Sequence, residues 1–462
     1  MYPKTRVRML LVCAYIHMRR IQLFYITIRK ASATVVQGAI ICTFGSSSST
    51  TGTSIGVADR SALMTVMAGQ NGDSRHLPDM KPKHTDELEK SNTWMLTEFN
   101  KPSQLRSLRL PDCLMPVRIS RLTYTNSGGA ILALGFNAVH KLWKWQANEG
   151  KATSSVPPQF WQPSNGVLMT NDMNPEDAIP CFALSKNDSY LISASGGKSS
   201  LYNMMTFERM TTFMPPPPAA TFVAFYPQDN NIVAIGIDDS SIDIYNVRFD
   251  EIKSKLKGHR KRVTGLAFSN VLNILVSSGA DAQLCVWSMD EWEKQASKFL
   301  QIPPGRVPSP RAQTRVQFHQ DQIHVLAIHE TQIAIYKAPK LEYLKQWVPQ
   351  ESCGSVTDAT YSCDSQSIYV SVEDGSVWVL TATTLQPRSR ISLDAYFPSN
   401  LSSRIYPIVI AAHPSQPNQF ALGLTNGGVY VIEPPESKGN WGVILPLENG
   451  AGPSFNLAAG LE

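Results

Sequence analysis

Three histidines at a regular spacing are the first residues of this sequence that could bind a metal ion. His319, His324 and His329 follow one another at intervals of five. Within a β-strand, such an interval places neighbours on opposite faces, because successive side chains alternate between the two faces. We also expect the turn between them not to gather the imidazoles. The spacing therefore favours no metal site, and we predict no bound cofactor.

A second candidate, GGKSS at Gly196 to Ser200, is similar to the end of a phosphate-binding loop. The full motif requires a further glycine at position 192, which is Ile192, so the match fails. The sequence also contains no GxSxG, no HExxH and no pair of carboxylates at a spacing that suggests acid and base roles. We predict no catalytic residues and no enzyme activity, although active-site residues gathered from distant repeats remain an alternative.

The densest charge cluster lies in KSKLKGHRKR and is a candidate binding loop for a protein partner. It leaves three interpretations open: a solvated loop, a docking site for an acidic peptide or phosphate, or part of an import signal. Its six cationic residues are Lys253, Lys255, Lys257, Arg260, Lys261 and Arg262.

The net charge of +5 does not extend over the whole chain. The first 30 residues hold seven of the 42 Lys and Arg, which leaves 35 basic against 37 acidic residues elsewhere. The body of the chain therefore has no global field for nucleic acid, and we expect no direct sequence-specific binding to it. The seven cysteines show no CxxC pairing, which favours a reducing intracellular compartment over a zinc ribbon or a disulfide framework.

The elements that must position these residues are clearest between Leu256 and Trp287, which read LKGHRKRVTGLAFSNVLNILVSSGADAQLCVW. A Gly-His pair precedes three short apolar segments, VTGLAF, ILVSS and LCVW, and Asp281 stands in the turn before the last. Short apolar runs are typical of strands that are covered on both faces. The pattern indicates one nearly complete WD repeat, a four-stranded antiparallel blade.

Four polar residues of this unit are expected to form one buried network. Asp281 can accept a hydrogen bond from His259, which reaches the hydroxyl of Ser277 and then the indole N–H of Trp287. Each such group needs a partner, since an unpaired buried polar group costs about 1–3 kcal/mol. We predict a structural role for all four.

The pattern recurs seven times, at intervals of about 42 to 59 residues, and seven blades close a ring. We therefore predict an all-β, seven-bladed WD-repeat β-propeller, preceded by a disordered N-terminal segment. Low charge (17%), with 28 Gly and 31 Pro, agrees with a turn-rich chain of 462 residues. The predicted blade turns hold Asn137, Gly196, Asp239, Asp281, Glu330, Asp374 and Asn426.

We expect four segments along the chain. Residues 1–30 are basic and apolar, with no run long enough to span a membrane, and a signal or presequence is an alternative to a non-native start. Residues 31–93 read as a low-complexity linker, 94–447 as the propeller and 448–462 as a tail. Trp94 to Pro111 is expected to supply an outer strand to the last blade. The four prolines from Pro215 to Pro218 favour a stiff connector over a ligand for aromatic grooves.

Several long stretches of this sequence closely resemble the C-terminal propeller of the plant TOPLESS and TOPLESS-related corepressors, relatives of Groucho-type proteins. The resemblance covers roughly Gly45 to Gly450. Among the segments that show it are FNKPSQLRSLRLP, WQPSNGVLMTND, TFMPPPPAATF, PQDNNIVAIGIDDSSIDIYNVR and RVQFHQDQIH.

This resemblance implies a nuclear, non-enzymatic scaffold that links DNA-bound repressors, including those of auxin and jasmonate signalling, to histone deacetylase-type chromatin machinery. The expected partners are transcription factors or adaptor repressors. The family's LisH and CTLH domain, which binds repression motifs, has no counterpart here, so that function is carried to no residue. Residues 1 to about 43 lie outside the resemblance, which suggests a truncated member or an incomplete gene model. A generic WD-repeat scaffold of another intracellular complex is the alternative.

Overall fold

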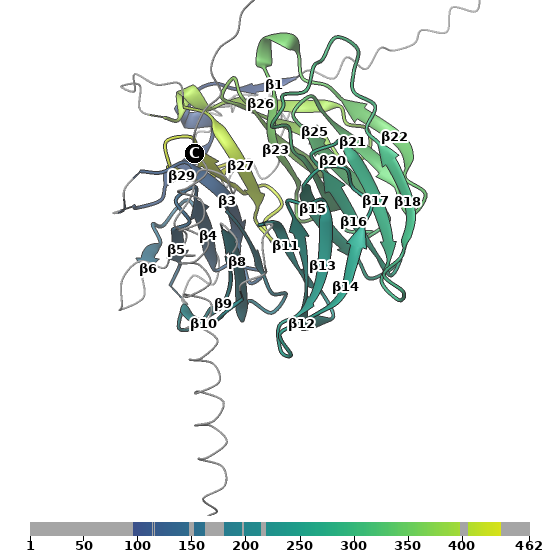
Figure 1. Cartoon of the computed structure of the whole chain (residues 1–462). Helices are drawn as coiled ribbons and strands as arrows, with labels where there is room; N and C mark the ends of the chain where they lie inside the picture. Colours follow the sequence, from purple (N-terminus) through teal and green to yellow (C-terminus); the bar gives the residue numbers. More distant parts are fainter. Residues whose placement is uncertain are drawn as a thin grey trace, which may run out of the picture. The chain divides into compact units, whose positions relative to one another are not determined.

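The computed structural model describes residues 96–112, 114, 116–146, 152–161, 180–195, 198–213, 219–397 and 405–435. The segments predicted for residues 1–30, 31–93 and 448–462, and the prolines at 215–218, lie outside these residues. The described part forms seven sheets arranged as the blades of a propeller, each with an antiparallel core, which confirms the predicted fold (Figure 1). No helix among the described residues is long and apolar enough to cross a membrane.

Each blade runs outward from an innermost strand to an outermost one. Blade 1 contains β3 (Ile119–Tyr124), β4 (Ala130–Gly135), β5 (His140–Lys144) and β6 (Gln159–Trp161), and blade 2 contains β7 (Cys181–Leu184), β8 (Tyr190–Ser195), β9 (Lys198–Asn203) and β10 (Glu208–Phe213). Blade 3 contains β11 (Ala220–Tyr226), β12 (Asp229–Ile237), β13 (Ser241–Asn246) and β14 (Glu251–Lys257), and blade 4 contains β15 (Val263–Ser269), β16 (Ile274–Gly279), β17 (Gln283–Ser288) and β18 (Lys294–Phe299). Blade 5 contains β19 (Thr314–Phe318), β20 (His324–His329), β21 (Gln332–Lys337) and β22 (Glu342–Trp347). Blade 6 contains β23 (Val356–Tyr361), β24 (Ser367–Val372), β25 (Ser376–Thr381) and β26 (Pro387–Ser392), and blade 7 contains β27 (Pro407–Ala412), β28 (Phe420–Leu424) and β29 (Val429–Glu433).

The N-terminal side of the described chain completes the ring. Strand β2 (Arg106–Arg109) pairs antiparallel with β29 and becomes the outer strand of blade 7. This confirms the predicted outer strand, which covers an edge that is otherwise open to solvent. Strand β1 (Thr97–Phe99) adds a feature that the sequence did not indicate, because it pairs parallel with β26 and gives blade 6 a fifth strand. Three 3₁₀ turns lie in the connections that the structure describes, η1 (Pro102–Gln104), η2 (Glu351–Cys353) and η3 (Leu393–Ala395).

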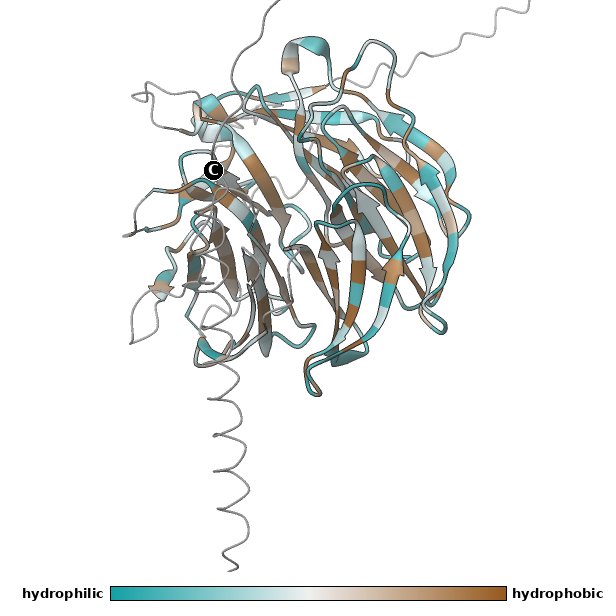
Figure 2. Cartoon of the chain, in the orientation of Figure 1, coloured by the Kyte–Doolittle hydropathy of each residue, from teal (hydrophilic) through white to brown (hydrophobic). Residues whose placement is uncertain are grey.

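The core lies between neighbouring blades. Strands β4, β16, β17 and β24 are buried along their whole length, as expected for short apolar strands covered on both faces. The outer strands β14, β18 and β22 are mostly exposed, and Figure 2 shows hydrophilic colours along β18 and β22. Side chains on the inner and middle strands therefore hold the ring together, and each fully buried aliphatic side chain contributes about 1.5–3 kcal/mol.

Strand direction defines two faces of the ring. We call the face at which the innermost strands begin the proximal face, and the face at which they end the distal face. Because the strands of a blade alternate in direction, the turn between its second and third strands also lies on the proximal face. Figure 1 places β3, β11, β15, β23 and β27 around the middle, with β6, β10, β14, β18 and β22 at the periphery.

Candidate partner-binding site

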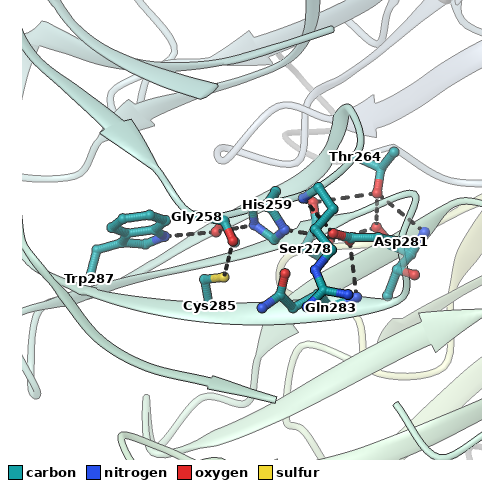
Figure 3. A network of polar contacts seen from close by, with 11 residues as sticks. Gly258, His259, Thr264, Ser278, Asp281, Gln283, Cys285 and Trp287 are labelled. Atoms are coloured by element: carbon teal, nitrogen blue, oxygen red, sulfur yellow. Dashed lines mark hydrogen bonds and ion pairs between the residues drawn. The ribbon is translucent and has the colours of Figure 1, made fainter. Parts of the chain in front are cut away.

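The predicted polar network lies within blade 4. Ser277 Oγ accepts a hydrogen bond from Trp287 Nε1 at 2.8 Å and lies 2.7 Å from His259 Nε2. The exposed fractions of Ser277 and Trp287 are 0% and 2%, and the imidazole of His259 is fully buried. In Figure 3, Trp287, His259 and Asp281 follow one another along the blade. The structure therefore brings together the residues that the sequence grouped.

The link between Asp281 and His259 is looser than expected from the sequence. Asp281 Oδ1 lies 3.6 Å from His259 Nδ1, which is an ion-pair distance and too long for a hydrogen bond. Asp281 instead accepts the backbone N–H groups of Arg260 at 2.7 Å and Gln283 at 3.2 Å. Burial by itself raises the pKa of Asp281, but the imidazole and these two N–H groups lower it below its usual value.

Gly279 allows the carboxylate of Asp281 to lie close to the imidazole of His259. A Cβ atom at this position would lie 2.4 Å from Asp281 Oδ1 and 2.8 Å from His259 Nδ1. Both distances are shorter than van der Waals contact, so only glycine leaves room for the carboxylate beside the ring.

The blade-turn residues share one local geometry. A side-chain oxygen at the turn accepts the backbone N–H two residues further on, the Asx-turn that Asn and Asp form readily. This bond is present at Asn137, Asp239, Asp281, Asp374 and Asn426. Glu330 differs, because its carboxylate accepts hydrogen bonds from the N–H and hydroxyl of Ser309. Gly196 lies outside the described residues.

The basic cluster is divided between two elements, whereas the sequence placed it on one loop. Lys253, Lys255 and Lys257 lie on the outer strand β14 of blade 3, where Lys255 and Lys257 share one face of the strand and Lys253 lies at an irregularity in its pairing with β13. Lys255 forms ion pairs with Asp239 at 3.4 Å and Asp243 at 3.7 Å, so part of the cluster is neutralised within the blade. Charged residues on an edge strand also prevent pairing with another sheet, which is a structural use of these lysines.

The remaining three cations lie on the connection into blade 4, at the proximal face. Arg260 and Lys261 are exposed and Arg262 is half-buried. The guanidinium of Arg260 stacks 5.2 Å from the ring centroid of Phe299. This connection is the part of the basic cluster whose charges face solvent.

A pocket at the proximal end of the central channel was missed from the sequence. Its volume is about 220 Å³, and its lining residues lie around the beginnings of the innermost strands of blades 1, 5, 6 and 7 and around the ends of the second strands of blades 1, 5 and 6. Residues from four blades meet only at the axis, so this pocket is the mouth of the channel. Its charged lining residues are Arg118, Arg121, Arg311, Arg315, Glu330 and Glu373.

Buried charges lie beneath this channel mouth. Arg315 forms an ion pair of 2.6 Å with Asp358, whose carboxylate also accepts the backbone N–H groups of Ile410 and Ala359. Burial raises the pKa of Asp358, and Arg315 and the two N–H groups oppose that shift. Burial and the nearby Arg315 lower the pKa of Arg121 to about 10. Because both carboxylate oxygens of Asp358 already have partners within the protein, the role of Asp358 is to hold Arg315 in place.

A sequence signal for these charges was present. The strand segments RLTYT, RVQFH and DATYS each begin with a charged residue, Arg121, Arg315 and Asp358, although strands covered on both faces are otherwise apolar. Asp358 neutralises Arg315, and the other three arginines against two glutamates still leave the channel mouth cationic. Such a surface attracts acidic side chains through long-range electrostatics.

The arrangement of the three histidines differs from the prediction. His319 and His324 lie together, with ring centroids 6.1 Å apart, so the prediction that the turn would separate them is wrong. They are cross-strand neighbours at the two ends of the turn between β19 and β20, and such neighbours share a face. His329, at the far end of β20, is buried and lines the channel pocket.

Comparison with known proteins agrees with this architecture. The family model described as "WD domain, G-beta repeat" matches residues 250–288, which include the blade 4 network. Topless-related protein 4 of Arabidopsis thaliana is 67% identical over 441 residues, covering 94% of this chain and 39% of that protein. Protein TOPLESS of Arabidopsis thaliana is 63% identical over 405 residues, covering 86% of this chain and 36% of its own length. Protein TPR3 of Oryza sativa subsp. japonica is 63% identical over 388 residues, covering 82% and 34%.

The chain spans about two fifths or less of the length of these relatives. The match of 441 residues is longer than the stretch from Gly45 to Gly450, so the similarity extends beyond the span expected from the sequence. High identity over most of the chain and a closed seven-bladed ring identify it as a WD-repeat protein of the TOPLESS type.

Proposed function

We propose that this chain is a non-enzymatic, protein-binding scaffold of a TOPLESS-type transcriptional corepressor. It acts in the nucleus, in negative regulation of transcription and hormone-responsive repression, including auxin signalling. It binds transcription factors or adaptor repressors and histone deacetylase-type chromatin machinery, and repression follows from bringing them together. The observation that carries this proposal is the 67% identity to Topless-related protein 4 along nearly the whole chain.

The proximal face is the proposed partner-binding surface. The cationic channel mouth with Arg118 and Arg311, both exposed, and the connection with Arg260 and Lys261 lie on this same face. A partner segment rich in Asp and Glu would be drawn to these charges, and charge complementarity selects partners and raises association rates. Closely packed blades keep the surface rigid, so little conformational entropy is lost on binding.

Partner capture from plant nuclear extract tests this proposal. The purified chain is immobilised, and bound deacetylases and transcription factors are quantified by mass spectrometry. We expect both classes to be captured, and the double variant R118E/R311E to lose most of the signal. The matched control K340E reverses an exposed charge on the distal face and should bind like the wild type. Capture of another WD-repeat complex, without deacetylases or transcription factors, would contradict the corepressor function.

A further inference from the structure

A cluster of three potential metal ligands lies on the distal face, away from the channel mouth. His319 follows the end of β19, Asp321 lies in the turn, and His324 begins β20. The turn is closed by backbone bonds from His319 N to His324 O at 2.8 Å and from Gln322 N to His319 O at 2.9 Å. Gln322 adopts a left-handed conformation, with φ of 57°, that reverses the chain. The backbone of a tight hairpin thus fixes the two histidines opposite each other.

Both imidazoles converge on one carboxylate oxygen. Asp321 Oδ2 lies 2.5 Å from His324 Nδ1 and 3.1 Å from His319 Nδ1. One ligand atom from each residue lies within 4.8 Å of the other two. The rings are nearly perpendicular, at 88°, so their nitrogens approach the carboxylate from different directions.

The carboxylate is held in position from behind. Asp321 Oδ1 accepts the backbone N–H groups of Ile323 at 2.8 Å and His324 at 3.0 Å, which leaves Oδ2 facing the histidines. The ring of Tyr361, from blade 6, packs edge-on against His319 with centroids 5.2 Å apart. Hydrogen bonds and packing of this kind orient the ligands of protein metal sites.

Space for an ion and its water is present beside the cluster. The three residues line a cavity of about 420 Å³ between blades 5 and 6, and their side chains are 26–35% exposed. Lys345 also lines this cavity, but its ammonium donates to the carbonyl of Thr383 at 2.6 Å. The cavity is therefore open to solvent, and the lysine charge is directed to a carbonyl.

We propose that His319, Asp321 and His324 form a binding site for Zn²⁺. Two imidazoles and one carboxylate match the N and O ligands that Zn²⁺ takes, whereas Mg²⁺ and Ca²⁺ prefer oxygen alone. Three protein ligands leave a fourth position for water, as in open zinc sites. Binding of the ion would release to solvent the proton shared by His324 Nδ1 and Asp321 Oδ2, and His319 Nδ1 would give up its 3.2 Å contact with the N–H of Asp321.

Titration calorimetry of the full chain, purified without a histidine tag and treated with chelator, tests this site with ZnCl₂. We expect one saturable site that H324Q and D321N each weaken by about 100-fold or more, since loss of a direct ligand should cost at least as much as the roughly 10–100-fold that loss of an outer-shell partner costs. Q320A is the matched control, because Gln320 is exposed in the same turn and is not one of the ligands, and it should bind like the wild type. MgCl₂ at the same concentrations should give no binding.

Two further measurements keep the outcome interpretable. Melting temperatures without metal establish that the variants fold, and with Zn²⁺ only the wild type and Q320A should gain stability. Co²⁺ should give the visible absorption of a four-coordinate site in the wild type and not in H324Q. Zn²⁺ binding that persists undiminished in H324Q and D321N, or an absence of binding to the wild type, would overturn the site and leave a hydrogen-bonded hairpin turn.

Discussion

Replacement of Ser277 by Ala removes the central link of the polar network in blade 4. Because the Asp281 carboxylate faces Nδ1 of His259, we assign a proton to that nitrogen, and Nε2 then accepts from the hydroxyl of Ser277. The Ser277 oxygen in turn accepts from the indole N–H of Trp287, which can only donate. The variant leaves an acceptor and a donor without partners.

The loss of stability expected for S277A follows from the burial of these two groups, His259 Nε2 and Trp287 Nε1. Neither group can reach water, since the exposed fraction of Trp287 is 2% and the imidazole of His259 is fully buried. Each unpaired buried polar group costs about 1–3 kcal/mol, and loss of the buried hydroxyl recovers part of that. We expect the free energy of unfolding to fall by about 2–4 kcal/mol. For a propeller of roughly 340 residues, with an unfolding entropy of about 2.1 cal/mol/K per residue, that corresponds to a decrease in melting temperature of about 3–6 °C.

Thermal unfolding followed by the fluorescence of the nine tryptophans measures this change, since unfolding exposes buried indoles such as that of Trp287 to water. The control S297A alters an exposed serine on β18 of the same blade and should leave the melting temperature within about 1 °C. If S277A also melted within 1 °C of the wild type, the network would not support the blade and our assignment of these residues would be refuted.

Three further predictions concern the ring. Deleting residues 94–111 removes β2 and the buried Leu105 and Leu110. The deletion should lower the free energy of unfolding by about 5 kcal/mol or more. An unchanged melting curve would exclude ring closure by this segment. G279A places a methyl group against Asp281 and His259 and should cost about 1–3 kcal/mol in urea denaturation, whereas a stability equal to the wild type would show that the turn can widen. Burial lowers the pKa of His140 from 6.5 to about 3, so between these pH values the unfolded chain takes up a proton that the folded chain does not. The contribution of His140 to the free energy of unfolding should therefore fall by about 1.4 kcal/mol per pH unit as the pH is lowered. In urea denaturation between pH 7 and 4, the free energy of unfolding of H140Q should decrease less steeply with falling pH than that of the wild type. Equal slopes for the two proteins would contradict this origin.

The sequence was most informative where one residue type meets one local requirement. Asn or Asp in the blade turn satisfies the backbone through its own side chain, so Asn137, Asp374 and Asn426 could be recognised without knowledge of distant contacts. The outer strand at 106–109 was also predictable, because a closed ring requires a partner for β29. The parallel strand β1 fulfils no such requirement and left no signal.

Residues brought together across turns or between blades were harder to predict. In a single strand, residues five apart such as His319 and His324 would lie on opposite faces. A hairpin turn between them instead makes them a cross-strand pair on the same face. Arg121, Arg315 and Asp358 are far apart in sequence and meet only at the channel. The basic cluster was continuous in sequence, yet it divides between a strand and a loop because β14 continues to Lys257.

The most direct test of corepressor function is a tethering assay in plant nuclei. The chain is fused to a DNA-binding domain, and expression of a reporter with the matching sites is compared with that for the DNA-binding domain alone. We predict repression by the wild-type chain and weaker repression by R118E/R311E. Unchanged reporter expression with a folded, nuclear fusion would contradict the proposal that this propeller recruits silencing machinery.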